Sequence, residues 1–594
     1  MSLIQDIRQA GTQAIKALYG KQLAPEELSV NDTKPEFEGE YTLVMFPLTK
    51  FSHQKPEETG KAVGDWLLEH FSSLFEKFNV VKGFLNLSIT DDTYTEFLRQ
   101  IGSDTAWAVR PANGKKVMVE YSSPNTNKPL HLGHLRNNFL GYSISRIMEA
   151  NGYEVIKANL VNDRGIHICK SMVAWLHFGK DTTPESTAVK GDHLVGDYYV
   201  KFNDIYKEQV AALISEGKTR GDAEKEAPIL VEAQQLLLKW EKGDPEVREL
   251  WASMNGWVYA GFDETYRRMG VSFDKFYYES QTYLLGKNIV EEGLAKGVFF
   301  KKPDGSVWVD LTAEGLDEKL LLRADGTSVY MTQDIGTAQL KYDDYRADSS
   351  IYVIGDEQNY HMNVLKLILK KLGKPYADGI DHLSYGMVEL PGGRMKSREG
   401  TVVDADDLMD EMMVTAERHT RELGKVKDFS EAELKGLYET LGMGAMKFYL
   451  LRVNPKKKMV FNPEESIDFH GFTGPFVQYT YARIRSILRK DNQEGDLLTT
   501  PCREPLLPLE KTVFVQIEQF ATVLHDACTD MDPSVIAGYA FNLAKTFNAF
   551  YAEHSVSKAE TPEKRSLRLA LCTATAAVIS HSMKLLGIRV PERM

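Results

Sequence analysis

Hydrophobic positions near the start of the chain recur first at helical and then at strand spacing. The apolar run 41–48 predicts a strand, residues 59–78 a helix, and residues 83–89 a further strand. The segment 111–114 is rich in turn residues and predicts a linker. The opening helix is predicted from the spacing of Leu3, Ile4, Ile7, Ile15 and Leu18.

Strands and helices then alternate. Residues 115–123 predict a strand, residues 131–152 a helix with one apolar face, and residues 153–161 a second strand. Two strands joined by one helix indicate a βαβ unit, and hence a parallel sheet with a right-handed crossover. The apolar face of the helix consists of Leu132, Leu135, Phe139, Leu140, Ile144, Ile147 and Met148.

The alternation returns later in the chain. Residues 351–357 predict a strand, a helix follows as far as Gly373, and residues 382–390 predict another strand. After about residue 440 the strand signals fade and helical periodicity remains. The fold class is therefore a multidomain α/β protein. Its expected parts are a small α+β domain (1–110), a Rossmann-like parallel-sheet domain (111–405) with a helical insertion (about 180–300), linking helices (406–440) and an α-helical bundle (441–594).

Composition limits the class of protein. The 594 residues carry a formal net charge of −13 and only four cysteines, too scattered for a disulfide framework or a zinc ladder. No apolar run approaches the roughly 18–20 residues of a membrane span. The N-terminus carries Asp6 and lacks a signal-peptide pattern. We therefore expect a cytoplasmic protein with no membrane contact.

Net charge alone argues against a nucleic-acid partner, but its distribution weakens that argument. From Leu441 to the end, 19 Lys and Arg face 16 Asp and Glu, a balance of +3. The remainder of the chain carries −16. The C-terminal part is thus mildly basic, whereas the rest of the chain is acidic.

The most informative segment is 120–136, which contains HLGH at 131–134 between a loop and a helix start. Exposed backbone N–H groups and the helix dipole favour phosphate there. Gly133 leaves room for a nucleotide to approach the backbone. His131 and His134 are three residues apart, so they project from one face and can donate to phosphate oxygens. The plain alternative is a helix start with two surface histidines.

A second segment, 390–400, follows a predicted strand directly. Three glycines together with Arg394, Lys396 and Arg398 predict a flexible basic loop suited to a polyphosphate. The alternative is an ordinary charged turn.

These segments resemble a known family. HLGH resembles the HIGH signature of class I aminoacyl-tRNA synthetases, and GRMKSREG resembles a degenerate KMSKS loop. The wider context resembles arginyl-tRNA synthetases from about residue 80 to the last residue. The segments that carry this likeness are 119–137, 327–338, 473–490 and the terminal LGIRVPERM.

The resemblance implies that ATP, with Mg²⁺ and without zinc, activates L-arginine to arginyl-AMP, and that arginine then passes to the 3′ adenosine of its tRNA. The second signature departs from the family pattern, and in such members a lysine just before HIGH compensates, which here is Lys128. The residues implied to be catalytic are His131, His134, Lys128, Lys396 and Arg398. Those implied to contact ATP are His131, Gly133, His134, Met395 and Lys396.

The resemblance also implies an arginine pocket. A guanidinium requires carboxylates, ideally bidentate, and Glu120 and Asp334 match the family's acidic contacts. An alternative for Asp334 is a helix N-cap. The residues implied to bind arginine are Glu120, Ser122, Asn125, Tyr330, Asp334 and Gln358.

The C-terminal bundle is implied to bind the anticodon, and residues 1–110 to touch the outer corner of the tRNA. Aromatic residues at helical spacing can equally belong to a core. The implied tRNA contacts are Phe476, Tyr479, Arg483, Tyr551 and Met594. We expect a monomer whose partners are L-arginine and its tRNA.

Two other classes remain open. A nucleotidylyltransferase also carries HxGH but leaves the C-terminal bundle unexplained. A noncatalytic tRNA-binding paralogue predicts decay of the signatures, whereas His131, His134, Glu120 and Asp334 are all present. A glutamate-specific enzyme would require cations in place of these two carboxylates, and a cysteine-specific enzyme would favour a metal site.

Overall fold

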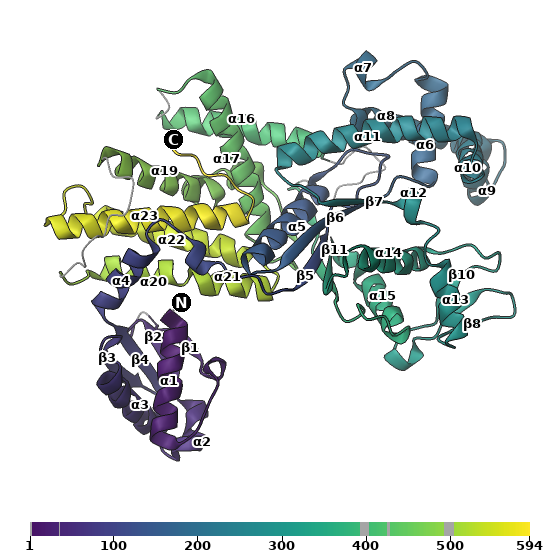
Figure 1. The fold of residues 1–594 in the computed structure, drawn as a ribbon. Helices are drawn as coiled ribbons and strands as arrows, with labels where there is room; N and C mark the ends of the chain where they lie inside the picture. Colours follow the sequence, from purple (N-terminus) through teal and green to yellow (C-terminus); the bar gives the residue numbers. More distant parts are fainter. Residues whose placement is uncertain (1–2, 35, 392–402, 425–427, 492–503) are drawn as a thin grey trace.

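The computed structural model describes residues 3–34, 36–391, 403–424, 428–491 and 504–594. Three bodies are visible in Figure 1: a small N-terminal unit, a central parallel sheet with helices and an insertion, and a C-terminal helical bundle. No helix among these residues is both long and apolar enough to cross a bilayer.

The N-terminal unit packs helices against a four-stranded antiparallel sheet of order β1-β2-β4-β3. The predicted helix 59–78 is wrong in its second half, because α3 ends at His70 and residues 75–81 form a strand paired with β4. The segment FEKFNVV contains aromatic and β-branched residues, which are enriched in strands. The elements are α1 (Leu3–Tyr19), α3 (Pro56–His70), β1 (Val30–Asp32), β2 (Tyr41–Val44), β3 (Phe75–Val81) and β4 (Phe84–Ile89).

The central sheet has five parallel strands in the order β12-β11-β5-β6-β7. The chain leaves β5 toward β6 on one side, whereas β11 lies on the other side, so the strand order reverses beside β5. Such a switch point opens a crevice at the carboxyl ends of the strands. The strands are β5 (Lys116–Glu120), β6 (Glu154–Val161), β7 (Lys275–Tyr278), β11 (Ser349–Gly355) and β12 (Ile380–Tyr385).

Helices cover this sheet as the sequence predicts. All seven predicted apolar positions of α5 (Leu132–Ala150) are buried, and Asn151 caps its C-terminus. The helices α14 (Tyr330–Tyr345) and α15 (Asn359–Lys371) accompany the other half of the sheet.

Two regions differ from the predicted secondary structure. Residues 275–278, expected within the helical insertion, form the edge strand β7. The predicted strand 382–390 splits at Gly386 into β12 and β13 (Val388–Glu389), and β13 pairs with β14 (Met459–Val460). A Cβ at Gly386 would lie 2.6 Å from the carbonyl carbon of Lys457, so the two chain segments approach closely there.

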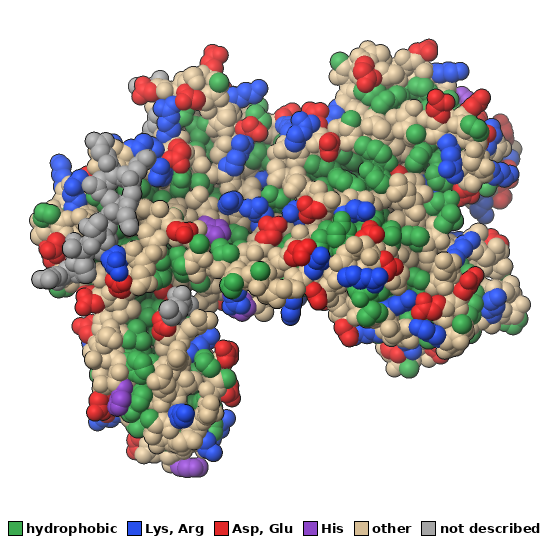
Figure 2. Space-filling view, viewed as in Figure 1, with side chains coloured by type: hydrophobic (Ala, Val, Ile, Leu, Met, Phe, Trp, Pro, Cys, Tyr) green, Lys and Arg blue, Asp and Glu red, His purple; other side chains and the backbone are tan. Residues whose placement is uncertain are grey.

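The insertion consists mainly of α8 (Gly191–Ser215), α10 (Pro228–Glu241) and α11 (Pro245–Met269), preceded by α6 (Ile166–Phe178). A three-stranded antiparallel sheet of β8 (Phe299–Lys301), β9 (Val307–Val309) and β10 (Lys319–Leu322) follows β7. Hydrophobic side chains gather between these two parts in Figure 2.

The C-terminal part is helical, as the sequence predicts. Its helices are α16 (Ala405–Leu423), α17 (Glu431–Leu451), α19 (Gly474–Lys490), α20 (Pro508–Glu518), α21 (Phe520–Thr529), α22 (Pro533–Glu553) and α23 (Pro562–Leu585). The N-terminal unit docks on this bundle, because Glu518 accepts hydrogen bonds from the Leu3 N–H (2.6 Å) and the Tyr41 hydroxyl (2.7 Å).

Candidate active site

The backbone is strained directly after β5. Ser122 and Ser123 have φ values of 78° and 45°, a left-handed conformation that non-glycine residues rarely adopt. Asn137 Oδ1 accepts the Ser122 N–H (2.6 Å), and Asn159 Oδ1 accepts the Ser123 N–H (3.1 Å). Such residues cost about 1–3 kcal/mol each and cluster at functional sites. The strained turn therefore marks the crevice beside β5 as the candidate site.

The two signature histidines share one hydrogen-bond arrangement at the start of α5. His131 Nδ1 accepts the Gly133 N–H at 3.1 Å, and His134 Nδ1 accepts the His131 N–H at 3.1 Å. The ring centroids are 4.0 Å apart. Because each Nδ1 is an acceptor, each neutral ring carries its proton on Nε2. Both rings therefore present an Nε2–H donor.

The charge state of both rings follows from their surroundings. Burial, with a smaller contribution from Lys128, lowers the pKa of His131 to about 3. Burial lowers the pKa of His134 well below its ordinary value, and His131 and Lys128 add to that effect. Burial also lowers the pKa of Lys128. Lys128 thus lies close to both histidines, which are neutral at physiological pH.

The absence of a side chain at Gly133 also makes room for the His131 ring. A Cβ at this position would lie 2.9 Å from His131 Cε1. Glycine therefore allows the His131 ring to lie over the first turn of α5.

The second signature falls outside the described residues, and with it Arg394, Met395, Lys396 and Arg398. The chain on its C-terminal side is described and pairs with the HLGH segment. The Leu132 N–H donates to the Val403 carbonyl (3.2 Å), and the Ala405 N–H donates to the Leu130 carbonyl (2.9 Å). The segment that follows the second signature is thus hydrogen-bonded to the start of the first.

Arg136 connects α5 to the chain on the N-terminal side of the second signature. Its fully buried guanidinium donates to the carbonyls of Gly386 (2.5 Å) and Lys457 (2.9 Å), with further bonds to Met387 and Pro455. The segment that leads into β13 is thereby held against the helix that carries both histidines.

A cavity of about 390 Å³ lies at the carboxyl edge of the sheet, between β5, α14 and α15. Of the residues implied to bind arginine, it brings together Glu120, Tyr330, Asp334 and Gln358. Ser122 and Asn125 are not among its lining residues. The Ser122 hydroxyl instead bonds to the Tyr266 hydroxyl at 2.7 Å, and Ser123 lines the cavity.

Sequence reasoning missed a basic residue in this cavity. Lys341 forms an ion pair with Glu120, and their side chains are only 3% and 7% exposed. The Lys341 Nζ also lies 4.5 Å from the centroid of the Tyr352 ring. Burial acts to lower the pKa of Lys341, but Glu120 and Tyr352 outweigh it, so the pKa is raised. The available signal was spacing, since Lys341 follows Asp334 by seven residues and shares its face of α14.

Asp334 faces a second missed residue. His361 Nε2 lies 2.6 Å from Asp334 Oδ2, and this hydrogen bond raises the pKa of His361. The N-cap alternative for Asp334 is wrong, because α14 begins at Tyr330 and Val329 caps it. Tyr330 is 78% exposed at the mouth of the cavity. The cavity therefore offers two carboxylates, one already neutralised by Lys341, and can hold a cationic molecule.

The residues implied to contact the anticodon lie on or beside the bundle. Phe476 is partly buried, with its ring 5.0 Å from Phe541, and Arg483 donates to Asn548 Oδ1 at 2.6 Å. Tyr479 lies beneath the Arg483 guanidinium at 4.8 Å. Tyr551 is exposed and stacks on Phe547 at 6.2 Å, and Met594 packs partly buried against the core.

One group of potential metal ligands occurs among the described residues, namely Asp192, His193 and Asp406. Lys190 Nζ lies 3.1 Å from Asp192 Oδ2 and 2.7 Å from Asp406 Oδ2, and Arg268 also donates to Asp406. Side-chain cations therefore already balance these carboxylates.

Comparison with known proteins identifies the family. Residues 98–462 match the family described as tRNA synthetases class I (R), catalytic domain, and residues 477–594 match the DALR anticodon binding domain. The arginine–tRNA ligase of Bacteroides thetaiotaomicron is 54% identical over 98% of both chains, and that of Parabacteroides distasonis is 52% identical over 100% of both. The fold matches that of Thermus thermophilus arginyl-tRNA synthetase with a TM-score of 0.78, at 24% identity over 99% of both chains. The chain therefore belongs to the arginyl-tRNA synthetase family of class I aminoacyl-tRNA synthetases.

Proposed function

We propose that the protein is an arginine–tRNA ligase, which activates L-arginine with ATP and transfers it to the 3′ adenosine of its tRNA. The observation that carries this proposal is the cavity that joins Glu120 and Asp334 at the switch point beside β5, the strand whose following loop leads to the paired histidines of α5. Glu120 is already paired with Lys341, so Asp334 is the carboxylate that can accept the guanidinium of arginine.

In the proposed first step, the arginine carboxylate attacks the α-phosphate of ATP, an acyl–phosphate bond forms and pyrophosphate leaves. The Nε2–H donors of His131 and His134 stabilise the charge that develops on the phosphate oxygens. Because both rings are neutral and fixed through Nδ1, they donate without a change in protonation. Lys128 adds positive charge beside them. Positioning and electrostatics suffice, since the phosphoryl chemistry requires no protein nucleophile.

ATP would lie between the HLGH segment and the chain that follows Glu389, with contacts from His131, Gly133 and His134. Mg²⁺ would neutralise the phosphates and, as it usually does, would keep several waters and bind through the nucleotide. The contacts of Met395, Lys396 and Arg398 stay predictions.

We assign the anticodon to the bundle 441–594, with Phe476, Tyr479, Arg483, Tyr551 and Met594 as contacts, and the outer corner of the tRNA to residues 1–110. The exposed ring of Tyr551 supports base stacking, which is worth about 1–3 kcal/mol per base. Residues 111–405 form the proposed catalytic domain and 406–440 the link to the bundle. We expect the enzyme to act as a monomer in the cytoplasm.

Aminoacylation with each amino acid in turn tests the proposal. Purified tRNA specific for arginine should be charged with arginine and not with glutamate, and ATP–pyrophosphate exchange should require both arginine and that tRNA. Exchange that ran equally well without tRNA, or with glutamate, would contradict the assignment. Tight tRNA binding without any charging would instead favour a noncatalytic paralogue.

A further inference from the structure

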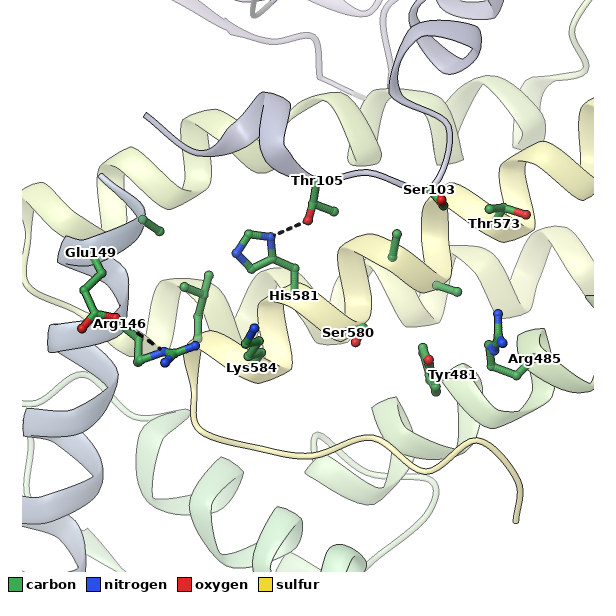
Figure 3. A pocket seen from close by; sticks show the side chains of 14 residues that line it. Ser103, Thr105, Arg146, Glu149, Tyr481, Arg485, Thr573, Ser580, His581 and Lys584 are labelled. Atoms are coloured by element: carbon green, nitrogen blue, oxygen red, sulfur yellow. Dashed lines mark hydrogen bonds and ion pairs between the residues drawn. The ribbon is translucent and has the colours of Figure 1, made fainter. Parts of the chain in front are cut away.

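A polar cavity of about 530 Å³ lies where three parts of the chain meet (Figure 3). The segment from Ser103 to Thr105 borders it on one side, and the end of α5 borders it on another. Arg146 comes from α5, Arg485 from α19 and Lys584 from α23, and their side chains approach this space from different sides.

A second cavity, of about 460 Å³, adjoins the first. It shares Arg146 and Lys584 with the first cavity, and it adds Arg267 and Arg268 at the end of α11 and Arg589 in the C-terminal tail. Residues of the catalytic domain, of α17 and of the bundle therefore line two adjoining cavities, which together we call the basic groove.

Positive charge dominates the lining. Apart from the buried Lys447, the basic residues are Arg146, Arg267, Arg268, Arg485, Lys584 and Arg589, whereas the acidic residues are Glu149 and Glu439. Much of this charge is compensated, because Arg485 pairs with Glu592 (2.7 Å), Arg268 with Asp406 (3.1 Å), Arg589 with Glu439 (3.6 Å) and Arg146 with Glu149 (3.8 Å). Arg267 and Lys584 have no carboxylate within ion-pair distance in the described parts of the chain.

The buried groups beside the groove also indicate an excess of positive charge. Lys447 is 5% exposed, and its ammonium donates to the Gly587 carbonyl at 2.5 Å, with no carboxylate partner among the described residues. Burial and the nearby Arg589 lower the pKa of Lys447 to about 7. Lys584 and Arg146 add to burial in lowering the pKa of His581 to about 4. An anion in the groove would relieve this repulsion.

We propose that the basic groove binds the sugar–phosphate backbone of tRNA between the active site and the anticodon-binding bundle. Helix α5 carries His134 near one end and Arg146 near the other, so the groove lies about 20 Å from the active site along this helix. A strand of nucleic acid that reaches both the active site and the bundle has to cross the region between them. This inference rests on the proposed function, because it names a surface for the same tRNA.

Charge-neutral variants test the proposal on the full-length enzyme. Arg146→Gln, Arg267→Gln and Lys584→Gln should each raise the dissociation constant and the KM for tRNA. Each should also reduce the slope of log K against log salt by about 0.7–0.9, the contribution of one phosphate contact. The KM values for arginine and ATP should stay unchanged. Lys239→Gln, an exposed lysine on α10 outside the groove, is the matched control.

Two outcomes would overturn the inference. One is an unchanged tRNA affinity and salt slope in the variant that combines Arg146→Gln, Arg267→Gln and Lys584→Gln, at an unchanged melting temperature. The other is that the same variant loses the ability to bind inorganic tripolyphosphate but keeps its tRNA affinity, which would assign the groove to a small anion. Lys584→Arg keeps the charge and should restore the wild-type slope if folding is intact. A wild-type enzyme that does not charge tRNA at all would contradict the proposed function instead.

Discussion

Lys341 lies against Glu120 in the candidate active-site cavity, and both side chains are almost completely buried. The carboxylate that closes β5 is thus already paired before a substrate arrives. The cavity consequently holds less negative charge than its two acidic residues suggest. Its charge is matched to one cationic group, with Asp334 facing His361 on the opposite side.

We expect Lys341→Met to destabilise the protein by about 3–5 kcal/mol, because it leaves a buried carboxylate without its counter-ion. Glu120→Gln combined with Lys341→Met should lose much less than the sum of the two single variants. Denaturant unfolding of the four proteins in this cycle measures the coupling. Additive losses would show that the pair contributes nothing.

Asp334→Asn should raise the KM for arginine roughly 10- to 150-fold, because a charged hydrogen bond contributes about 1.5–3 kcal/mol. The KM for ATP should change little. Asp343→Asn, on the same helix but outside the cavity, is the control and should leave both values unchanged. Equal effects of the two variants would remove Asp334 from the arginine site.

His131→Asn separates the two ring nitrogens. Asparagine retains an acceptor for the first turn of α5 and caps helices well, but it lacks a donor at the Nε2 position. We expect a loss of about 100- to 1000-fold in ATP–pyrophosphate exchange with little change in melting temperature. His131→Gln, whose amide reaches farther, should retain more activity than His131→Asn. The reverse order would contradict the role of Nε2–H.

Gly133→Ala should displace the His131 ring, since the added Cβ would lie 2.9 Å from its Cε1. The kcat should fall while the KM for tRNA stays near its wild-type value. Gly436→Ala, in α17 where a Cβ meets open space, should leave activity intact and stabilise the helix by up to about 1 kcal/mol. Steady-state kinetics and thermal melting of both variants provide the comparison.

The pH dependence of stability should contain a contribution from His581. Its folded pKa, about 4, lies below its ordinary value, so the unfolded chain binds the proton more readily between about pH 6.5 and 4. Stability is therefore complete above that window and falls with decreasing pH, by at most about 1.4 kcal/mol per pH unit from this group. Melting temperatures at pH 7 and pH 5 should differ less in His581→Gln than in the wild type. Equal differences would contradict this origin.

Sequence patterns predicted the elements whose signals are local. The apolar face of α5 and the alternation of β5, α5 and β6 follow from periodicity, and each lies where it was expected. The predicted helix 59–78 failed because residues 75–81 are determined by their partner strand β4, a non-local influence. The strand β7 was missed for the same reason, since its four residues form a strand through pairing with β6.

The candidate site was predictable to the extent that its residues stand in recognisable segments. Glu120, Asp334 and the two histidines belong to such segments. Lys341 lies outside them and shares only a helix face with Asp334, whereas His361 enters the cavity through the packing of α14 and α15. The backbone conformation of Ser122 and Ser123 could not be predicted from the sequence. The left-handed turn that directs one hydroxyl toward Tyr266 and places its neighbour at the cavity leaves no mark in composition or periodicity.

The bond between the first helix and Glu518 has a consequence for biosynthesis. The N–H of Leu3 and the hydroxyl of Tyr41 share this buried carboxylate across 515 and 477 residues of sequence. A ribosome that adds about 5–20 residues per second would take about 25–100 s to reach that partner. During this interval the docking face of the N-terminal unit lacks its partner on the bundle. We expect chaperones that act during translation to have access to this face.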